Sequence, residues 1–157
     1  MTMNIMDFLV PSSVALHYAG RDSTDVISHL GKCLFDAGYV HETFVEAALD
    51  RESRLPTGLP LSGDINAAIP HTEVEHVIKP GLAMATLSTP VIFQNMISPD
   101  EAVPCQLVFV MALDQPKAQI EMLQEIAGIL QNPAVINSLM SANDFEEVRT
   151  TFSNDRS

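Results

Sequence analysis

Basic residues are scarce in this chain. Of its 157 residues only eight are Lys or Arg, against 20 that are Asp or Glu, which leaves a net charge of −12. Nucleic acids and anionic membrane surfaces attract cationic proteins, so a charge of this sign argues against both as general partners. We therefore expect a docking partner to be neutral or basic where it meets this protein.

Cysteine and long apolar runs are also scarce. Cys33 and Cys105 lie in apolar runs and have no CxxC or metal-ligand spacing, so we expect both to be reduced thiols in the core. No apolar run approaches the ~18 to 20 residues of a membrane span. The segment 1–10 has neither the basic start nor the apolar length of a signal peptide. These absences predict a cytoplasmic protein that does not insert into the membrane.

Nucleotide-binding motifs are absent as well. The chain has no Walker-type glycine loop, no GxSxG elbow and no dinucleotide fingerprint. We therefore expect no ATP or NAD site and no bound cofactor. A phosphate group on this chain would have to come from another protein.

Apolar residues that recur with the 3.6-residue period of a helix dominate much of the chain. Together with capping and terminating residues they predict helices at residues 23–37, 41–53, 116–130, 133–139 and 145–152. Ser23 or Thr24 is the expected cap of the first helix and Gly38 its expected end. Asn143 and Glu146 resemble a capping box for the last helix.

Apolar stretches predict strands at residues 82–87, 90–94 and 105–113. The last of these is almost continuously apolar, as in a central strand that is buried on both faces. Residues 4–18 are expected to be an extended lead-in with at most a short strand, and residues 55–71 to be turns and extended chain. With no linker or internal repeat, the sequence predicts one α/β domain over residues 1–157, in which helices flank a mixed central sheet.

The most informative segment combines arginines, a stiff loop and one imidazole. The run Arg51-Glu-Ser-Arg-Leu-Pro-Thr-Gly precedes the run Ala-Ile-Pro-His71-Thr. Pro70 fixes its own φ and pushes Ile69 into an extended conformation, so the next side chain is presented in a defined direction. A neutral imidazole can attack a phosphoryl group, and the guanidinium of Arg51 or Arg54 could then balance the charge. The segment therefore predicts a histidine that accepts phosphate.

Simpler roles stay open for these residues. Arg51 and Arg54 fall at the end of the preceding helix, where cations complement the helix dipole. His71 could be a turn residue whose ring caps a neighbour. It could also belong to a zinc site, although one without thiolate ligands, formed with His76 and Glu73 or Glu75.

At these residues the sequence resembles the fructose/mannitol-type enzyme IIA domains of the bacterial sugar phosphotransferase system. The resemblance spans essentially the whole chain and rests on three ordered motifs: Arg51-Glu52, Pro56-Thr57-Gly58 and Ala68-Ile69-Pro70-His71. Within that family the chain looks most like the galactitol-type IIA proteins. Those proteins share its single-domain form and a glutamine-containing start to the later helix.

The resemblance implies that His71 accepts phosphate on Nε2 from the histidine phosphocarrier protein. The phosphate would then pass to a cysteine of a cognate IIB protein, which phosphorylates a sugar alcohol such as galactitol as it enters through the membrane IIC component. Arg51 would pair with the phosphoryl oxygens, and Thr57 would lie near the site. Mannitol-type members carry a second active-site histidine where this chain has Gln119, whose amide can donate a hydrogen bond to phosphate but cannot carry a proton.

Two other functions stay open at this point. The same fold could act as a regulatory module whose phosphorylation state controls a kinase or a transcription regulator. It could also have lost phosphotransfer and act by binding alone, although the intact residues Arg51, Thr57 and His71 argue against this. The sequence does not encode the sugar, because domains of this kind contact partner proteins rather than the sugar.

Overall fold

The central strand explains why helices can cover both faces of the sheet. The computed structural model describes residues 4–156, and in it β5 (Ala102–Ala112) is fully buried along its second half. Side chains there alternate between two hydrophobic cores, with Leu107, Phe109 and Met111 in one and Val108, Val110 and Ala112 in the other. The almost continuously apolar run is thus a strand buried on both faces, which confirms the sequence-based prediction.

The described residues form one mixed sheet with the strand order β1-β4-β5-β3-β2. Its strands are β1 (Leu9–Tyr18), β2 (Gly58–Leu59), β3 (Ala67–Ala68), β4 (Gly81–Gln94) and β5. β1 runs parallel to β4 and β3 runs parallel to β5, whereas the pairs β4–β5 and β2–β3 are antiparallel. The predicted mixed sheet is confirmed.

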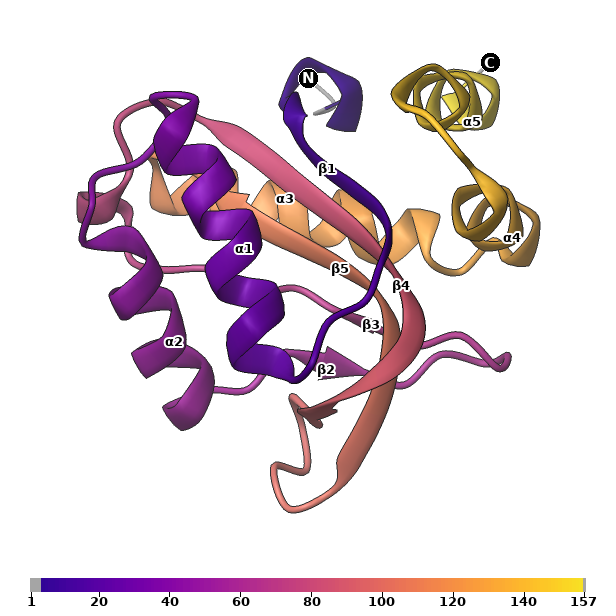
Figure 1. The fold of residues 1–157 in the computed structure, drawn as a ribbon, viewed down its shortest axis with the longest axis horizontal. Coiled ribbons are helices and arrows are strands. Elements are labelled where there is room, and N and C mark those ends of the chain that lie inside the picture. Colours follow the sequence, from indigo (N-terminus) through magenta and orange to yellow (C-terminus); the bar gives the residue numbers. More distant parts are fainter. Residues whose placement is uncertain (1–3, 157) are drawn as a thin grey trace.

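Helices lie on both faces of this sheet (Figure 1). The helical elements are a short 3-10 turn η1 (Ile5–Asp7), α1 (Ser23–Asp36), α2 (Phe44–Arg54), a second 3-10 turn η2 (Val74–His76), α3 (Pro116–Ile129), α4 (Pro133–Ser141) and α5 (Phe145–Arg156). α1 and α2 pack into one core, whereas α3, α4 and α5 pack into the other. The chain folds as the α/β domain that the sequence predicts.

The first two helices start differently from the prediction. The cap of α1 is Asp22, whose carboxylate accepts a hydrogen bond from the Asp25 N–H at 2.8 Å, rather than Ser23 or Thr24. Gly38 ends this helix region with a φ of 86°, as expected. α2 begins at Phe44 rather than at residue 41, because residues 41–43 form a turn in which the Phe44 N–H donates to the His41 carbonyl.

The cap of the last helix lies one residue later than predicted. The side chain of Asp144, not of Asn143, accepts the hydrogen bond from the Glu147 N–H at 2.9 Å. In turn, the Asn143 N–H donates a hydrogen bond to the carboxylate of Glu147, rather than of Glu146, at 3.3 Å. Glu146 instead pairs with Arg149 on the helix surface.

Two strand predictions were too short. The stretches 82–87 and 90–94 belong to the single strand β4, whose pairing with β5 shifts register between Thr86 and Val91. A proline is tolerated at such an irregularity because no ladder hydrogen bond is required of it. The lead-in also becomes a ten-residue strand, β1, with two irregularities in its pairing to β4.

The predictions of one domain over residues 1–157 and of no signal segment in residues 1–10 include positions outside the described residues, namely 1–3 and 157. Within residues 4–156 no helix has the length and apolar character needed to cross a membrane.

Three segments that are distant in the sequence meet near the carboxyl end of β5. The chain after β3 continues along β5, so that the Met111 N–H donates to the Pro70 carbonyl at 3.0 Å and His71 lies beside Met111. α2 ends at Arg54, just before the loop to β2, and α3 begins at Pro116, soon after β5 ends. The predicted site residues are therefore carried by elements that meet at this point.

Candidate functional site

His71 is held in one orientation by its own backbone. Its Nδ1 lies 3.0 Å from the carbonyl oxygen of Ile69. A carbonyl oxygen only accepts hydrogen bonds, so Nδ1 carries the proton and Nε2 keeps its lone pair. Partial burial lowers the pKa of His71 from its ordinary value of 6.5, and the nearby charge of Arg51 acts in the same direction. The ring is therefore neutral near neutral pH, with a nucleophilic Nε2.

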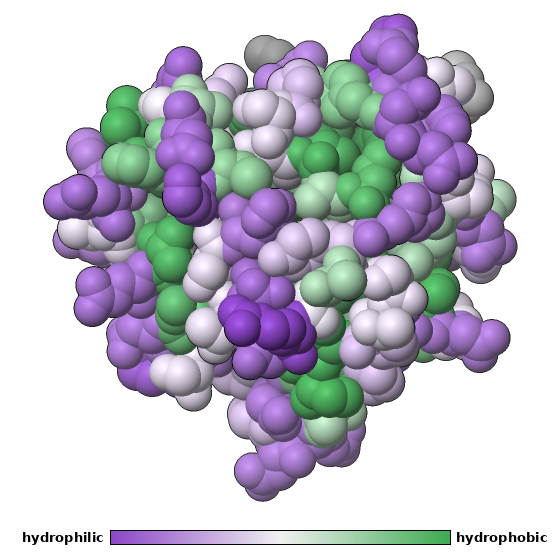
Figure 2. Space-filling view, in the orientation of Figure 1, coloured by the Kyte–Doolittle hydropathy of each residue, from purple (hydrophilic) through white to green (hydrophobic). Residues whose placement is uncertain are grey.

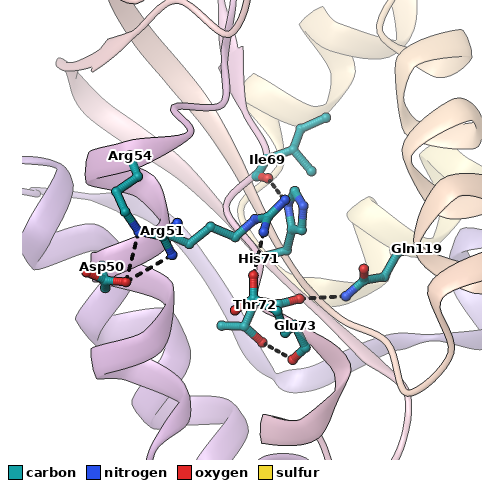
Figure 3. A network of polar contacts seen from close by, with 8 residues as sticks. All are labelled: Asp50, Arg51, Arg54, Ile69, His71, Thr72, Glu73 and Gln119. Carbon is teal, nitrogen blue, oxygen red and sulfur yellow. Dashed lines mark hydrogen bonds and ion pairs between the residues drawn. The ribbon is translucent and has the colours of Figure 1, made fainter.

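Arg51 reaches from α2 toward the His71 ring (Figure 3). Its guanidinium forms an ion pair with Glu73, and about a quarter of the side chain (26%) is exposed. Within the described part of the chain, its Nε is buried and has no hydrogen-bond partner. Arg51 thus keeps a free donor next to the imidazole.

Arg54 does not join this group. Its guanidinium pairs with Asp50 one helical turn earlier, with its Nη2 3.0 Å from the Asp50 carboxylate, and Figure 3 shows the pair directed away from the ring. Of the two arginines that the sequence offered as charge partners, only Arg51 faces His71.

Glu73 is the acid that pairs with Arg51 beside the His71 ring. Burial acts to raise the pKa of Glu73, but a backbone hydrogen bond and the hydrogen bond and charge of Arg51 outweigh it, so this pKa lies below its ordinary value. The sequence offered Glu73 or Glu75 as a possible zinc ligand together with His71 and His76. In the structure Glu73 instead holds Arg51.

Gln119 approaches the same loop from the first turns of α3 (Figure 3). Its Nε2 donates a hydrogen bond to the Thr72 carbonyl at 2.6 Å. In this way Gln119 ties α3 to the residue that follows His71. The amide therefore lies close to the imidazole, although its donor is engaged with the backbone.

Thr57 lies behind the site rather than on it. The side chain is 3% exposed, and its hydroxyl donates to Glu52 at 2.8 Å while accepting from the Ile69 N–H at 3.2 Å. Sequence reasoning missed Glu52, although Phe44, Ala48 and Glu52 follow one another at intervals of one helical turn. The first two are fully buried, so this spacing could have placed Glu52 on the inner face of α2.

Two features that the sequence suggested, a metal site that includes His76 and a pair of core thiols, can be compared with the described residues. Nδ1 of His76 lies 2.9 Å from the Thr43 hydroxyl, and residues 4–156 contain no group of three or more His, Cys, Asp or Glu side chains that could hold a metal ion. Both cysteines are free. Cys105 is buried, which raises the pKa of its thiol to about 12. Cys33 is only partly buried, so the prediction of a core thiol is confirmed for Cys105 alone.

Apolar residues surround the site unevenly. Leu55, just after α2, is half-exposed, whereas Leu59 and Leu61 are partly buried and Ile69 is fully buried in the core. Ile120, which follows Gln119 on α3, is 60% exposed and was not anticipated.

Chemically, this arrangement presents a neutral imidazole at the protein surface with a guanidinium beside it. Such a pair can accept a small anionic electrophile on Nε2 and stabilise the charge that then develops. The His71 ring and the Arg51 side chain are both partly exposed, so a phosphoryl group carried by another protein could reach them.

Comparison with known proteins shows what the chain is similar to. The family described as "Phosphoenolpyruvate-dependent sugar phosphotransferase system, EIIA 2" matches residues 7–155. The galactitol-specific EIIA component of the phosphotransferase system of Escherichia coli is 30% identical over 120 residues, which are 76% of this chain and 79% of that protein.

Solved structures share the fold. The crystal structure of the mannitol IIA protein from Escherichia coli superposes with a TM-score of 0.75 at 26% identity, and the match covers 92% of this chain and 98% of that one. A complex of enzyme IIA mannitol with phosphorylated enzyme IIB mannitol from Escherichia coli contains a chain with a TM-score of 0.75 at 25% identity. That match covers 93% of this chain and 97% of the other.

Proposed function

Because the chain belongs to the EIIA 2 family of the phosphoenolpyruvate-dependent sugar phosphotransferase system, we propose that His71 is the residue that carries its phosphoryl group. As a member of that family the chain is a phosphotransferase component and a phosphocarrier. The observation that carries the assignment is the bond from Nδ1 of His71 to the Ile69 carbonyl, which leaves Nε2 as the nucleophile.

The transfer step needs no group other than the two imidazoles and the phosphoryl group. The lone pair of Nε2 attacks phosphorus as the N–P bond of the donor phosphohistidine breaks, and the electron pair of that bond returns to the donor ring. His71 keeps its Nδ1 proton throughout. The hydrogen bond to the Ile69 carbonyl therefore stabilises the positive charge that the phosphorylated ring acquires.

Arg51 is the group that stabilises the phosphoryl oxygens in this proposal. Its buried Nε offers a donor without a partner among the described residues, and its Nη1 is held by Glu73. A guanidinium presents several donors in one plane, which matches the oxygens of a phosphoryl group. Gln119 supports the loop from the other side through the Thr72 carbonyl, and Thr57 supports it from behind.

The proposed partners follow from the same chemistry. The donor is the histidine phosphocarrier protein, and the acceptor is a cysteine of a cognate IIB protein, which serves a membrane IIC component. The complex of mannitol IIA with phosphorylated mannitol IIB supports an acceptor of this kind. The galactitol-specific relative, at 30% identity, supports galactitol as the transported sugar. The protein would act on the cytoplasmic side of the membrane.

Intact mass spectrometry tests the assignment of His71. The purified protein is incubated with phosphoenolpyruvate, enzyme I and the phosphocarrier protein, alongside the variants His71→Ala and His76→Ala. His76 is a matched control, because it lies in the same segment but is bonded to Thr43. We expect the wild type and His76→Ala to gain one acid-labile phosphate and His71→Ala to gain none.

A phosphate that persists in His71→Ala would contradict this assignment. No gain in the wild type, under conditions that phosphorylate a known IIA protein, would contradict phosphocarrier activity for this chain and favour a role in binding alone. A regulatory role stays a prediction. Transfer of the phosphate to a IIB protein would support a role in transport, and a lack of transfer would favour regulation.

A further inference from the structure

We propose that Glu52 is a positioning residue for phosphotransfer: through Thr57 and Ile69, its carboxylate holds the His71 ring so that Nε2 faces the incoming phosphoryl group. This inference rests on the proposed function of His71. It assigns a role to the glutamate of the Arg-Glu pair and to the threonine of the Pro-Thr-Gly run.

The contact with Glu52 fixes the direction of both Thr57 donors. The backbone N–H of Thr57 donates to one carboxylate oxygen of Glu52 at 2.8 Å, and its hydroxyl donates to the other at 2.8 Å. With its hydrogen committed to Glu52, the hydroxyl oxygen can act only as an acceptor toward the rest of the protein. The Ile69 N–H donates to that oxygen at 3.2 Å.

The network continues from Ile69 to the imidazole. The carbonyl oxygen of Ile69 accepts the Nδ1 proton of His71 at 3.0 Å, and Pro70 between them stiffens the chain. Ile69 is fully buried, so no water competes for its backbone groups. Four hydrogen bonds therefore link the Glu52 carboxylate to the tautomer and the orientation of the ring.

Glu52 cannot act by touching the phosphate. Both of its oxygens accept hydrogen bonds from Thr57, and a carboxylate repels phosphoryl oxygens. Its influence on the reaction has to pass through the backbone that carries His71. That is why we describe Glu52 as a positioning residue and not as a catalytic one.

A glutamate at position 52 carries the free-energy cost of burying a carboxylate. It follows the fully buried Phe44 and Ala48 on the inner face of α2, and burial raises its pKa from 4.5 to about 7 even though the Thr57 bonds and the Arg51 charge oppose this. An apolar side chain would continue the buried stripe at no such cost. The chain nevertheless has a carboxylate there, as expected if its two acceptor oxygens are needed.

The proposal predicts a pH dependence with a definite sign. The carboxylate accepts both Thr57 donors only when it is ionised, so ordering of the His71 segment should weaken as the pH falls through about 7. Arg51 on α2 and the Cys105 thiol on β5 are the other titratable groups that act on Glu52. Arg54 also lies nearby, because Glu52 and Arg54 both line one hollow in the protein surface. The Cys105 thiol stays neutral across this range, because burial raises its pKa to about 12. Protonation of His71 itself follows at lower pH, because burial lowers its pKa below 6.5.

The experiment combines phosphorylation rates with ¹⁵N NMR of the His71 ring in the full chain. Thr57→Val removes the hydroxyl at nearly constant volume, Thr57→Ser keeps it and is the matched control, and Glu52→Gln removes the charge. We expect phosphorylation of Thr57→Val by the phosphocarrier protein to be about tenfold slower, as for a lost hydrogen bond to a charged group. We also expect its ring to lose the fixed Nδ1–H tautomer, and Thr57→Ser to behave like the wild type.

Glu52→Gln separates positioning from simple packing. The wild-type rate should fall in two steps as the pH decreases, and Glu52→Gln should lack the step near pH 7. Wild-type tautomer and wild-type pH profile in both Thr57→Val and Glu52→Gln would overturn the inference. If Thr57→Val does not fold, the comparison of wild type with Glu52→Gln decides the question. If the wild type is not phosphorylated at all, the proposed function fails, but the NMR spectra still show whether Glu52 sets the tautomer.

Discussion

At the scale of single residues, the site is defined by which partners each polar group already has. Nδ1 of His71 is committed to the Ile69 carbonyl, so Nε2 is the only ring nitrogen left for chemistry. Arg51 is shared, because its Nη1 is bound by Glu73 while its Nε is unpartnered within the described residues. A phosphoryl group on His71 would therefore compete with Glu73 for the guanidinium.

This competition predicts that Glu73 lowers the stability of the phosphorylated form. In Glu73→Gln the guanidinium is released, so the equilibrium ratio of phosphorylated to unphosphorylated protein should rise by up to about fivefold, the range of an exposed ion pair. The measurement is the phosphorylated fraction at a fixed ratio of phosphorylated to free donor protein. Glu75→Gln is the control, because Glu75 is exposed and lies in the 3-10 turn η2, which Glu73 precedes. A lower fraction in Glu73→Gln would show that Glu73 positions Arg51 instead of competing for it.

At the scale of secondary structure elements, the sequence predicts helices better than strand lengths. α1 and α3 lie almost where their periodic apolar residues place them. β4 was divided in two by its exposed Ser-Thr-Pro segment, because a local pattern does not show that β5 pairs with both halves across an irregularity. β2 and β3 are too short for any periodic signal, since each has two residues and depends on its neighbours in the sheet.

Gly58 in β2 is sensitive to substitution, because it packs closely against the end of β4. A Cβ at Gly58 would lie 2.6 Å from the Gln94 carbonyl oxygen and 3.3 Å from the Val103 Cβ, and the backbone oxygen cannot move aside without disturbing β4. We expect Gly58→Ala to lower the free energy of unfolding by about 1 to 3 kcal/mol, as for overpacking of a core. Urea unfolding measures this change. Gly63→Ala is the control, because a Cβ there meets nothing within 4 Å, and equal stability of the two variants would contradict the close packing of β2 on β4.

At the scale of the whole molecule, the fold brings together residues that the sequence could only place in order along the chain. His71 and Arg51 were predicted from motifs and Gln119 from the family resemblance, and the structure brings the three side chains together (Figure 3). The sequence could not show that Thr57 faces inward or that Glu73 holds Arg51, because both facts depend on how α2 packs against the β3–η2 segment. Glu52 was named only as part of the Arg51-Glu52 motif and was given no role, because the sequence does not show that its carboxylate meets Thr57.

The molecular surface is consistent with brief contacts with other proteins. In Figure 2 hydrophilic atoms cover much of the visible face, and apolar atoms gather in small groups, one of them near the β4–β5 hairpin. The exposed apolar residues of that hairpin region are Ile92 and Ile97, and Leu55 and Ile120 are exposed on the elements that carry the site. Small apolar groups of this kind suit partners that must leave after each transfer.

Delivery of the phosphoryl group is the most direct test of the proposed function. The phosphorylated protein, separated from its donor, is mixed with purified IIB proteins of the galactitol and mannitol types, and the loss of phosphate from the chain is followed by intact mass. We expect transfer to the galactitol-type IIB protein, at a higher rate than to the mannitol-type protein. Faster transfer to the mannitol type would contradict the choice of galactitol. Phosphate that stays on the chain with every IIB protein would contradict a role in transport and favour a regulatory one.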